Sequence, residues 1–251
     1  MKQSKPIIGI MPTFNLTNPS NEPHEDRASF VRLYVDKISS CGGIPIGLLE
    51  ENVSDYLDIC DAFLWPGGTK IWPSFYKVIE HSLKTHKPIL GVCMGAQAIA
   101  NYFNMLDDQK RMPDKSLSEV YDLMREENPY LLKMSDDQAS IHKHFLTKDK
   151  ESIDKARHEI EINEKSKLYE ILGTKTKNVV SIHRLCINRL PGDIVLSAKS
   201  KDGVIEGIEY FIDNNHIIGV QYHPELDDDK KIFKWLVDTA LEVKNARDSR
   251  S

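Results

Sequence analysis

The chain has 251 residues, of which 40% are hydrophobic and 28% charged, and its formal net charge is −5 at pH 7. This composition is ordinary for a globular protein, and the length suits one large α/β domain over residues 1–251. The acidic balance argues against nucleic acid as a partner, and no apolar stretch is long enough to cross a membrane. The four cysteines are widely spaced without a Cys-x-x-Cys pair, so we expect no disulfide framework, no zinc ribbon and a reducing, cytoplasmic location.

Apolar runs alternate with segments of helical spacing over the first hundred residues. Strands are expected at 7–11, 44–49, 62–65 and 89–92, and helices at 30–38, 53–59, 72–84 and 96–102. This alternation predicts parallel β-α-β units in a doubly wound sheet with helices on both faces. The polar, turn-rich residues 14–26 predict a surface loop beside the end of the first strand.

The stretch from Gly91 to Gly95 has the pattern of a nucleophile elbow, in which a strand turns sharply into a helix and presents Cys93 at its tip. We expect a Cβ at either glycine to clash, because the turn brings two backbones into close approach. The helix N-terminus behind Cys93 would stabilise negative charge on sulfur and on an oxyanion. A buried structural cysteine between two incidental glycines is the alternative.

Pro66-Gly67-Gly68 follows the third strand at the carboxyl edge of the sheet, where ligands bind in open α/β folds. The two glycines expose backbone N–H groups that could form half of an oxyanion hole. An ordinary strand-to-loop turn is the other interpretation, and the nearby elbow favours the functional one.

Residues 105–157 are dense in charged side chains and contain no convincing apolar strand. Within them, residues 117–124 keep helical spacing, and Ser116 with Glu119 forms a capping-box signature. We interpret this segment as a helical insertion; a cover over the site, a solvated appendage and an oligomer contact remain open. His142 and His144 lie on it, and we expect both to be solvated and no metal to bind.

The remaining residues return to β-structure. Strands are expected at 158–162, 179–183, 194–198, 205–212 and 217–222, with hairpin turns at 201–203 and 213–215 and a closing helix around 233–241. The last strand leads into His223-Pro224-Glu225.

A thiol nucleophile needs a base, and histidine has the pKa that suits this near neutral pH. His223 follows a strand and precedes a proline, so Glu225 can fold back to orient its imidazole, as the third member of a catalytic triad does. His183 is the competing base, but it lacks an adjacent carboxylate, and we interpret it as a substrate-side or structural residue.

Two motifs, Gly91-Val-Cys-Met-Gly-Ala-Gln97 and Gly219-Val-Gln-Tyr-His-Pro-Glu225, together resemble the class I glutamine amidotransferase superfamily. More narrowly, the chain is similar to its gamma-glutamyl hydrolase branch, typified by gamma-glutamyl-GABA hydrolase. Collinear matches at Pro6–Ile10, Gly42–Ile46, Leu64–Gly68, Ser181–His183 and Asp202–Glu206 extend the resemblance over most of the chain outside the insertion.

The resemblance implies a flavodoxin-like fold without a cofactor, and attack of Cys93 on a γ-glutamyl amide to give a thioester. His223 would move the proton and Glu225 would orient His223. Backbone N–H groups would hold the oxyanion, and further residues would lie near the glutamyl group. The N–H groups are those of Met94 and of Gly67 or Gly68; the glutamyl-side residues are Gln97 and Ser181.

The sequence departs from that branch at two places on the substrate side. The loop after Gly68 is short and leads to Ile71-Trp72, and Asn101–Met105 replaces the usual Gly-Gly stretch. The leaving group therefore stays open. A stand-alone hydrolase of a small γ-glutamyl compound is favoured; the alternatives are a glutaminase that passes ammonia to a synthetase partner and a non-catalytic interaction protein. A homo-oligomer also remains open.

Overall fold

The computed structural model describes residues 4–13, 28–50, 52–69, 71–124, 128–142, 153 and 155–249. The loop expected at 14–26 and His144 lie outside these residues. In the described part of the chain, nine strands form one sheet with the order β2-β1-β3-β4-β11-β10-β9-β6-β7. The strands are β1 (Ile7–Ile10), β2 (Ile44–Gly47), β3 (Ala62–Trp65), β4 (Ile89–Val92), β6 (Arg157–Ile162), β7 (Thr176–Val180), β9 (Val195–Ser200), β10 (Ile205–Tyr210) and β11 (Ile217–Val220).

The sheet has two halves. Strands β2, β1, β3, β4 and β11 pair in parallel, while β11, β10, β9, β6 and β7 pair antiparallel. The expected α/β fold is confirmed, and β3 and β4 have the predicted bounds. The hairpin turns also form where expected, because Gly203, Asp213 and Asn214 adopt the positive φ values that tight turns require.

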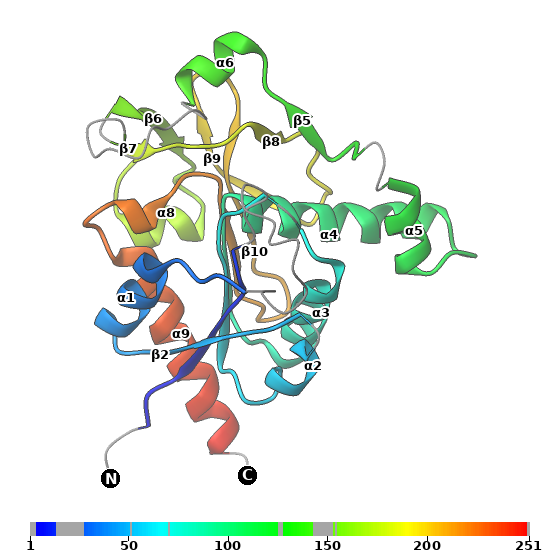
Figure 1. Cartoon of the computed structure of the whole chain (residues 1–251), viewed down its shortest axis with the longest axis vertical. Coiled ribbons are helices and arrows are strands. Elements are labelled where there is room, and N and C mark those ends of the chain that lie inside the picture. Colours follow the sequence, from blue (N-terminus) through cyan, green and yellow to red (C-terminus); the bar gives the residue numbers. More distant parts are fainter. Residues whose placement is uncertain are drawn as a thin grey trace, which may run out of the picture.

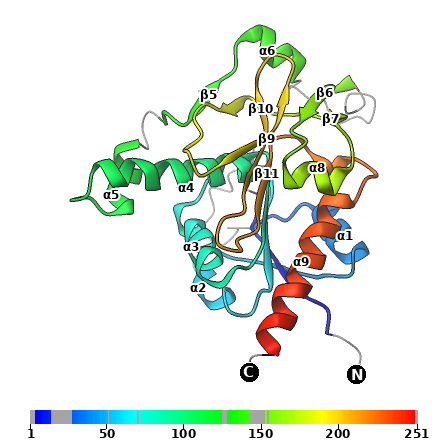
Figure 2. The ribbon, with the colours of Figure 1, turned by 180° about the vertical axis from the view of Figure 1, so that it is seen from behind.

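Helices cover both faces of the sheet (Figures 1 and 2). The helical segments are α1 (Arg32–Ser40), α2 (Val53–Tyr56), η2 (Pro73–Phe75), α3 (Tyr76–Thr85), α4 (Met94–Arg111), α5 (Leu117–Met124), α6 (Asp136–Ile141), α8 (Lys167–Leu172), η3 (Pro224–Leu226) and α9 (Lys231–Asp248). Successive residues of β3 face opposite sides of the sheet, so the core has two parts. Leu64 belongs to the part with α1, α8 and α9, and Trp65 to the part with α3 and α4. No helix among the described residues is both long and apolar enough to cross a membrane.

The insertion differs from its sequence-based description in one respect. It contains a short strand, β5 (Leu131–Lys133), which pairs antiparallel with β8 (Leu185–Ile187). Only three residues make this strand, so the pattern of apolar residues was too short to indicate it. The predicted helix is confirmed as α5, and Ser116 and Glu119 exchange the hydrogen bonds of a capping box.

The apolar side of α5 is covered by the body of the protein. Val120 is fully buried, and the ring of Tyr121 lies 6.1 Å from the ring of Tyr76 on α3. Helix α5 therefore packs against α3 and alongside α4 (Figure 1).

Candidate active site

The register of the parallel strands brings three chain segments to one edge of the sheet. Trp65 pairs with Gly91, and Val220 pairs with Val92. The residues that follow these strands therefore leave the sheet together, which places Gly67, Cys93 and His223 side by side. The amide of Cys93 donates to the carbonyl of Val220 over 2.8 Å and fixes the turn against β11.

Cys93 occupies a strained backbone conformation, with φ 51° and ψ −106°, at the N-cap of α4. Such a conformation is rare for a residue with a side chain, and strain of this kind gathers at functional sites. Both flanking glycines are required, as the sequence predicted. A Cβ on Gly95 would lie 2.0 Å from the carbonyl oxygen of Trp65, and one on Gly91 would lie 2.7 Å from the backbone of Gly95.

His223 is bonded to Glu225 over 2.7 Å, between Nδ1 and Oε1. The ring lies next to the elbow, since a Cβ placed on Gly67 would be 2.9 Å from His223 Cε1 and 3.4 Å from Cys93 Cβ. Nε2 of His223 has no hydrogen bond of good geometry among the described residues. Burial alone would lower the pKa of His223, but Glu225 and then Cys93 outweigh burial and raise that pKa well above its ordinary value.

Tyr34 is part of this site although its sequence context indicated only a core position on a helix. Its hydroxyl accepts the N–H of Gly67 over 3.4 Å. Burial, followed by the charge of Glu225, raises the pKa of Tyr34 well above its ordinary value, so it remains a neutral phenol beside that carboxylate. Apolar spacing marks a buried face and does not distinguish a phenol that serves a site, so the sequence held no signal for it.

The other predicted residues lie around the elbow in different settings. Met94 is the first residue of α4, so its N–H lies outside the hydrogen-bond ladder of the helix. Gly68 is half-buried. Gln97, one turn beyond Cys93, donates to the carbonyl of Leu185 over 2.8 Å and to Gln221 Oε1 over 3.1 Å.

The strand expected at 179–183 ends at Val180, so Ser181 and His183 lie in the loop before β8. Both are buried. His183 directs Nδ1 to the carbonyl of Leu185 and Nε2 to Glu206, at 3.0 and 3.4 Å. It is therefore not placed as a base for Cys93.

Sequence comparison assigns the chain to a known family. The chain matches the Peptidase C26 family over residues 6–82 and 131–225, which together make up more than half of its length. The chain belongs to the Peptidase C26 family. The part of the chain that matches the family includes His223 and Glu225, whereas the elbow at Cys93 lies outside the match.

Individual relatives agree with this family and with the class I glutamine amidotransferase-like group. A glutamine amidotransferase-like protein of Rickettsia prowazekii is 29% identical over 94% of this chain and 98% of its own length. CTP synthase of Thermotoga maritima is 29% identical over 70% of this chain and 34% of its own length. A GMP synthase component of Thermoplasma acidophilum, solved at 2.45 Å, shares the fold with a TM-score of 0.59, 16% identity and coverage of 98% of both chains.

Proposed function

We propose that this chain is a cysteine-dependent hydrolase that cleaves the γ-glutamyl amide bond of glutamine or of a small γ-glutamyl compound through a γ-glutamyl thioester. The observation that carries this proposal is the position of His223, which is bonded to Glu225 and packed with Cys93 against Gly67. Family membership supports it, because the relatives include proteins named as glutamine amidotransferase-like.

The reaction follows from the two nitrogens of His223. Nδ1 is held by Glu225, so Nε2 is the nitrogen left to accept the proton of the Cys93 thiol. The sulfur then attacks the amide carbon, and collapse of the tetrahedral intermediate breaks the C–N bond while His223 protonates the leaving amine or ammonia. Water, deprotonated by His223, attacks the thioester and releases glutamate and free thiol.

The oxyanion would be held by the N–H of Met94 and by one glycine N–H after β3. Gly67 already directs its N–H to Tyr34, so Gly68 supplies the more available donor of the pair. Tyr34 and the Gly67 amide would hold this loop in place against Glu225.

Gln97, Ser181 and His183 shape the side of the site that faces β8. We assign them to the glutamyl end of the substrate, with His183 acting through the Leu185 carbonyl that it shares with Gln97. This arrangement lets the loop before β8 respond to substrate without direct contact by the His183 ring.

The leaving-group end of the substrate would lie toward α3 and α5. Both departures from the gamma-glutamyl hydrolase pattern, Ile71 and the Asn101–Met105 stretch, contribute residues to the lining of one cavity. The insertion completes that cavity with Tyr121, Met124 and Tyr130. We therefore assign the insertion a part in selecting the amine.

A panel of γ-glutamyl amides of increasing amine size tests the hydrolase, with ammonia or amine release as the measurement. We expect thiol-dependent turnover by the isolated chain, lost in Cys93→Ala. Filling the cavity with Met124→Trp should change the ratio of kcat/KM between small and large amines, whereas Leu123→Trp, at a neighbouring exposed position, should not. No turnover of any amide by the isolated chain would contradict the stand-alone hydrolase.

A glutaminase that delivers ammonia to a synthetase is the second candidate. The match to CTP synthase of Thermotoga maritima favours it, because this chain corresponds to about a third of that protein. Glutamine turnover that appears only when a synthetase from the same cell is added would support this candidate over the first.

A further inference from the structure

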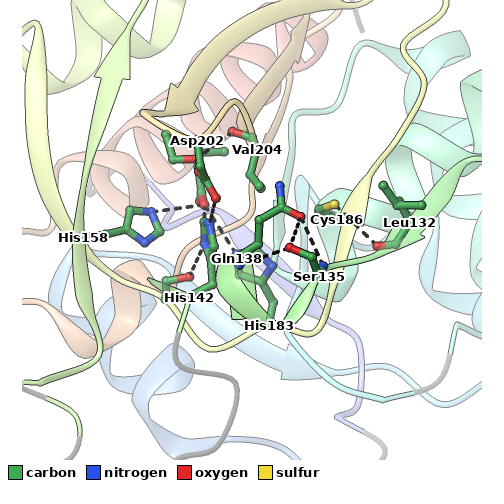
Figure 3. A network of polar contacts seen from close by, with 12 residues as sticks. Leu132, Ser135, Gln138, His142, His158, His183, Cys186, Asp202 and Val204 are labelled. Carbon is green, nitrogen blue, oxygen red and sulfur yellow. Dashed lines mark hydrogen bonds and ion pairs between the residues drawn. The ribbon is translucent and has the colours of Figure 1, made fainter. Parts of the chain in front are cut away.

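A second group of titratable side chains lies outside the candidate active site, around the carboxylate of Glu206 on β10. Glu206 is completely buried, and one of its oxygens, Oε1, faces three imidazoles. The distances are 3.2 Å to His142 Nδ1, 3.2 Å to His158 Nε2 and 3.4 Å to His183 Nε2. Figure 3 shows the three rings converging from the end of α6, from β6 and from the loop before β8.

The position of His142 corrects the expectation that it is a solvated residue of a charged segment. Its side chain is fully buried. The C-terminal end of α6 carries it down onto the sheet, where its ring centre lies 4.4 Å from that of His158 and 4.7 Å from that of His183.

Two of these rings meet hydrogen-bond acceptors on both sides. His142 directs Nε2 to the carboxylate of Asp202 at 3.2 Å and Nδ1 to Glu206, and the hydroxyl of Ser181 lies 3.3 Å from the same Nδ1. His183 directs Nδ1 to the carbonyl of Leu185 at 3.0 Å and Nε2 to Glu206. A neutral imidazole has a single N–H, so a ring that serves Asp202 or Leu185 turns a lone pair toward Glu206.

The centre of the group therefore holds buried acceptor atoms without a matching donor. Both oxygens of Glu206 and Nε2 of His183 are buried without a hydrogen bond of good geometry. A bound cation would satisfy the lone pairs of both rings and the carboxylate at once.

The distances suit a transition-metal ion. Ligand atoms on a tetrahedral zinc ion with bonds of about 2.0–2.1 Å lie about 3.3 Å apart, which matches the spacing of Glu206 Oε1 from the two ring nitrogens. One ligand atom from each of His142, His183 and Glu206 lies within 4.8 Å of the others. Ligating histidines usually donate their second N–H to a carboxylate or a backbone carbonyl, and Asp202 and Leu185 occupy those places here.

We propose that His142, His183 and Glu206 bind one divalent transition-metal ion, with zinc the best match to two imidazoles and a carboxylate. Asp202 and the Leu185 carbonyl hold the two rings, and His158 lies against the carboxylate. The ion fastens the end of the insertion to the antiparallel half of the sheet. It also adjoins the glutamyl side of the candidate active site, since Leu185 accepts from both His183 and Gln97.

The test measures metal in the full chain, purified without an affinity tag. We expect elemental analysis to find about one zinc per chain, or the EDTA-treated chain to bind one equivalent when zinc is titrated back. Cobalt should give the visible absorption bands of a site with nitrogen and oxygen ligands. His142→Ala and Glu206→Gln should lose the ion, and Asp202→Asn should bind it about 10- to 100-fold more weakly.

Two control variants should keep the ion. His86→Asn removes an exposed histidine far from this group and keeps a residue that tolerates the left-handed backbone there. Cys93→Ala removes the elbow thiol, which is the other zinc ligand at hand. Because the measurement is metal content, the result does not depend on whether the chain hydrolyses γ-glutamyl amides.

Absence of binding above the background of the buffer, or equal stoichiometry in His142→Ala and the unaltered chain, would overturn the proposal. So would loss of the ion in Cys93→Ala alone. Should His142→Ala and Glu206→Gln unfold by circular dichroism, Asp202→Asn decides: weaker binding supports the site, and unchanged affinity rules it out.

Discussion

Each half of the sheet holds a buried group of imidazole and carboxylate side chains. The two groups differ in how their hydrogen-bond donors match their acceptors. At the parallel edge, His223 has one carboxylate partner, Glu225, and one open nitrogen beside a thiol. In the antiparallel half, Glu206 has three rings, two of which already serve other acceptors. The first group is left with a nitrogen that can take a proton, which is what a base requires. The second is left with converging lone pairs, which is what a cation requires.

The largest expected effect tests whether the chemistry belongs to the first group alone. Cys93→Ala should lower kcat at least about 10⁴-fold on any γ-glutamyl amide that the chain hydrolyses, because the nucleophile is lost. The melting temperature should stay close to that of the unaltered chain. Steady-state kinetics and thermal denaturation make the measurement, and Cys41→Ala, at a half-buried cysteine on the surface, is the control.

Alkylation gives an independent check on the same residue. Burial raises the pKa of the Cys60 thiol to about 12, and burial also raises the pKa values of Cys41 and Cys186. We therefore expect brief iodoacetamide treatment to label Cys93 first, by mass spectrometry. Faster labelling of Cys41 would contradict the assignment of the nucleophile.

The next prediction separates the histidines of the two groups. His223→Ala should lower kcat by about 10³- to 10⁴-fold, and Glu225→Gln by about 10²- to 10⁴-fold, since the ring loses its orientation. His183→Ala should act mainly on KM and on thermal stability, because its ring faces Glu206 and Leu185. Kinetics on one substrate for all three variants would show this, and a larger loss of kcat in His183→Ala than in His223→Ala would reverse the two roles.

The contrast also explains what could be predicted from the sequence. The parallel edge is built from contiguous motifs, because in parallel strands the residues just after each strand meet at one edge. A strand pattern and a short motif are then enough to place Gly67, Cys93 and His223 together, and β3 and β4 have the expected bounds.

The group around Glu206 could not be assembled in the same way. Its members come from four separate segments, and their contact depends on the register of antiparallel strands and on the path of the insertion. A signal was present, because Glu206 interrupts the apolar run from Val204 to Ile208, and a charged residue in such a run needs a partner. Sequence spacing did not identify His142 as that partner, since it lies on a segment rich in charge.

A smaller effect is expected on stability at the elbow. Gly95→Ala should lower the free energy of unfolding by about 3 kcal/mol, the upper end for overpacking, because the new Cβ would lie 2.0 Å from the Trp65 carbonyl oxygen. Gly192→Ala is the matched control, since nothing lies within 4 Å of a Cβ there, and it should change stability by less than about 0.5 kcal/mol. Urea denaturation measures both, and equal stability of the two variants would show that the close approach at the elbow is not needed.

The smallest expected effect concerns pH and the pairing of His223 with Glu225. The pKa of His223 is raised in the folded protein, so the folded chain holds a proton that the unfolded chain releases above pH about 6.5. The stabilisation from this proton is complete below that pH and is lost as pH rises through the folded pKa. Its slope reaches at most about 1.4 kcal/mol per pH unit.

The comparison is best made without the thiol, which also faces His223. We would measure the free energy of unfolding of Cys93→Ala and of Cys93→Ala with Glu225→Gln between pH 6 and pH 9. The first variant should be the more stable of the two, and this difference in the free energy of unfolding should shrink as pH rises. The reason is that Glu225 is the largest of the causes that raise the pKa of His223 against burial. The histidines around Glu206 are the same in both variants, so their titration cancels in the difference. A difference in the free energy of unfolding that stays constant or grows with pH would mean that His223 is neutral in the folded protein. The groups around His223 and Glu206 would then be more alike than their geometry indicates.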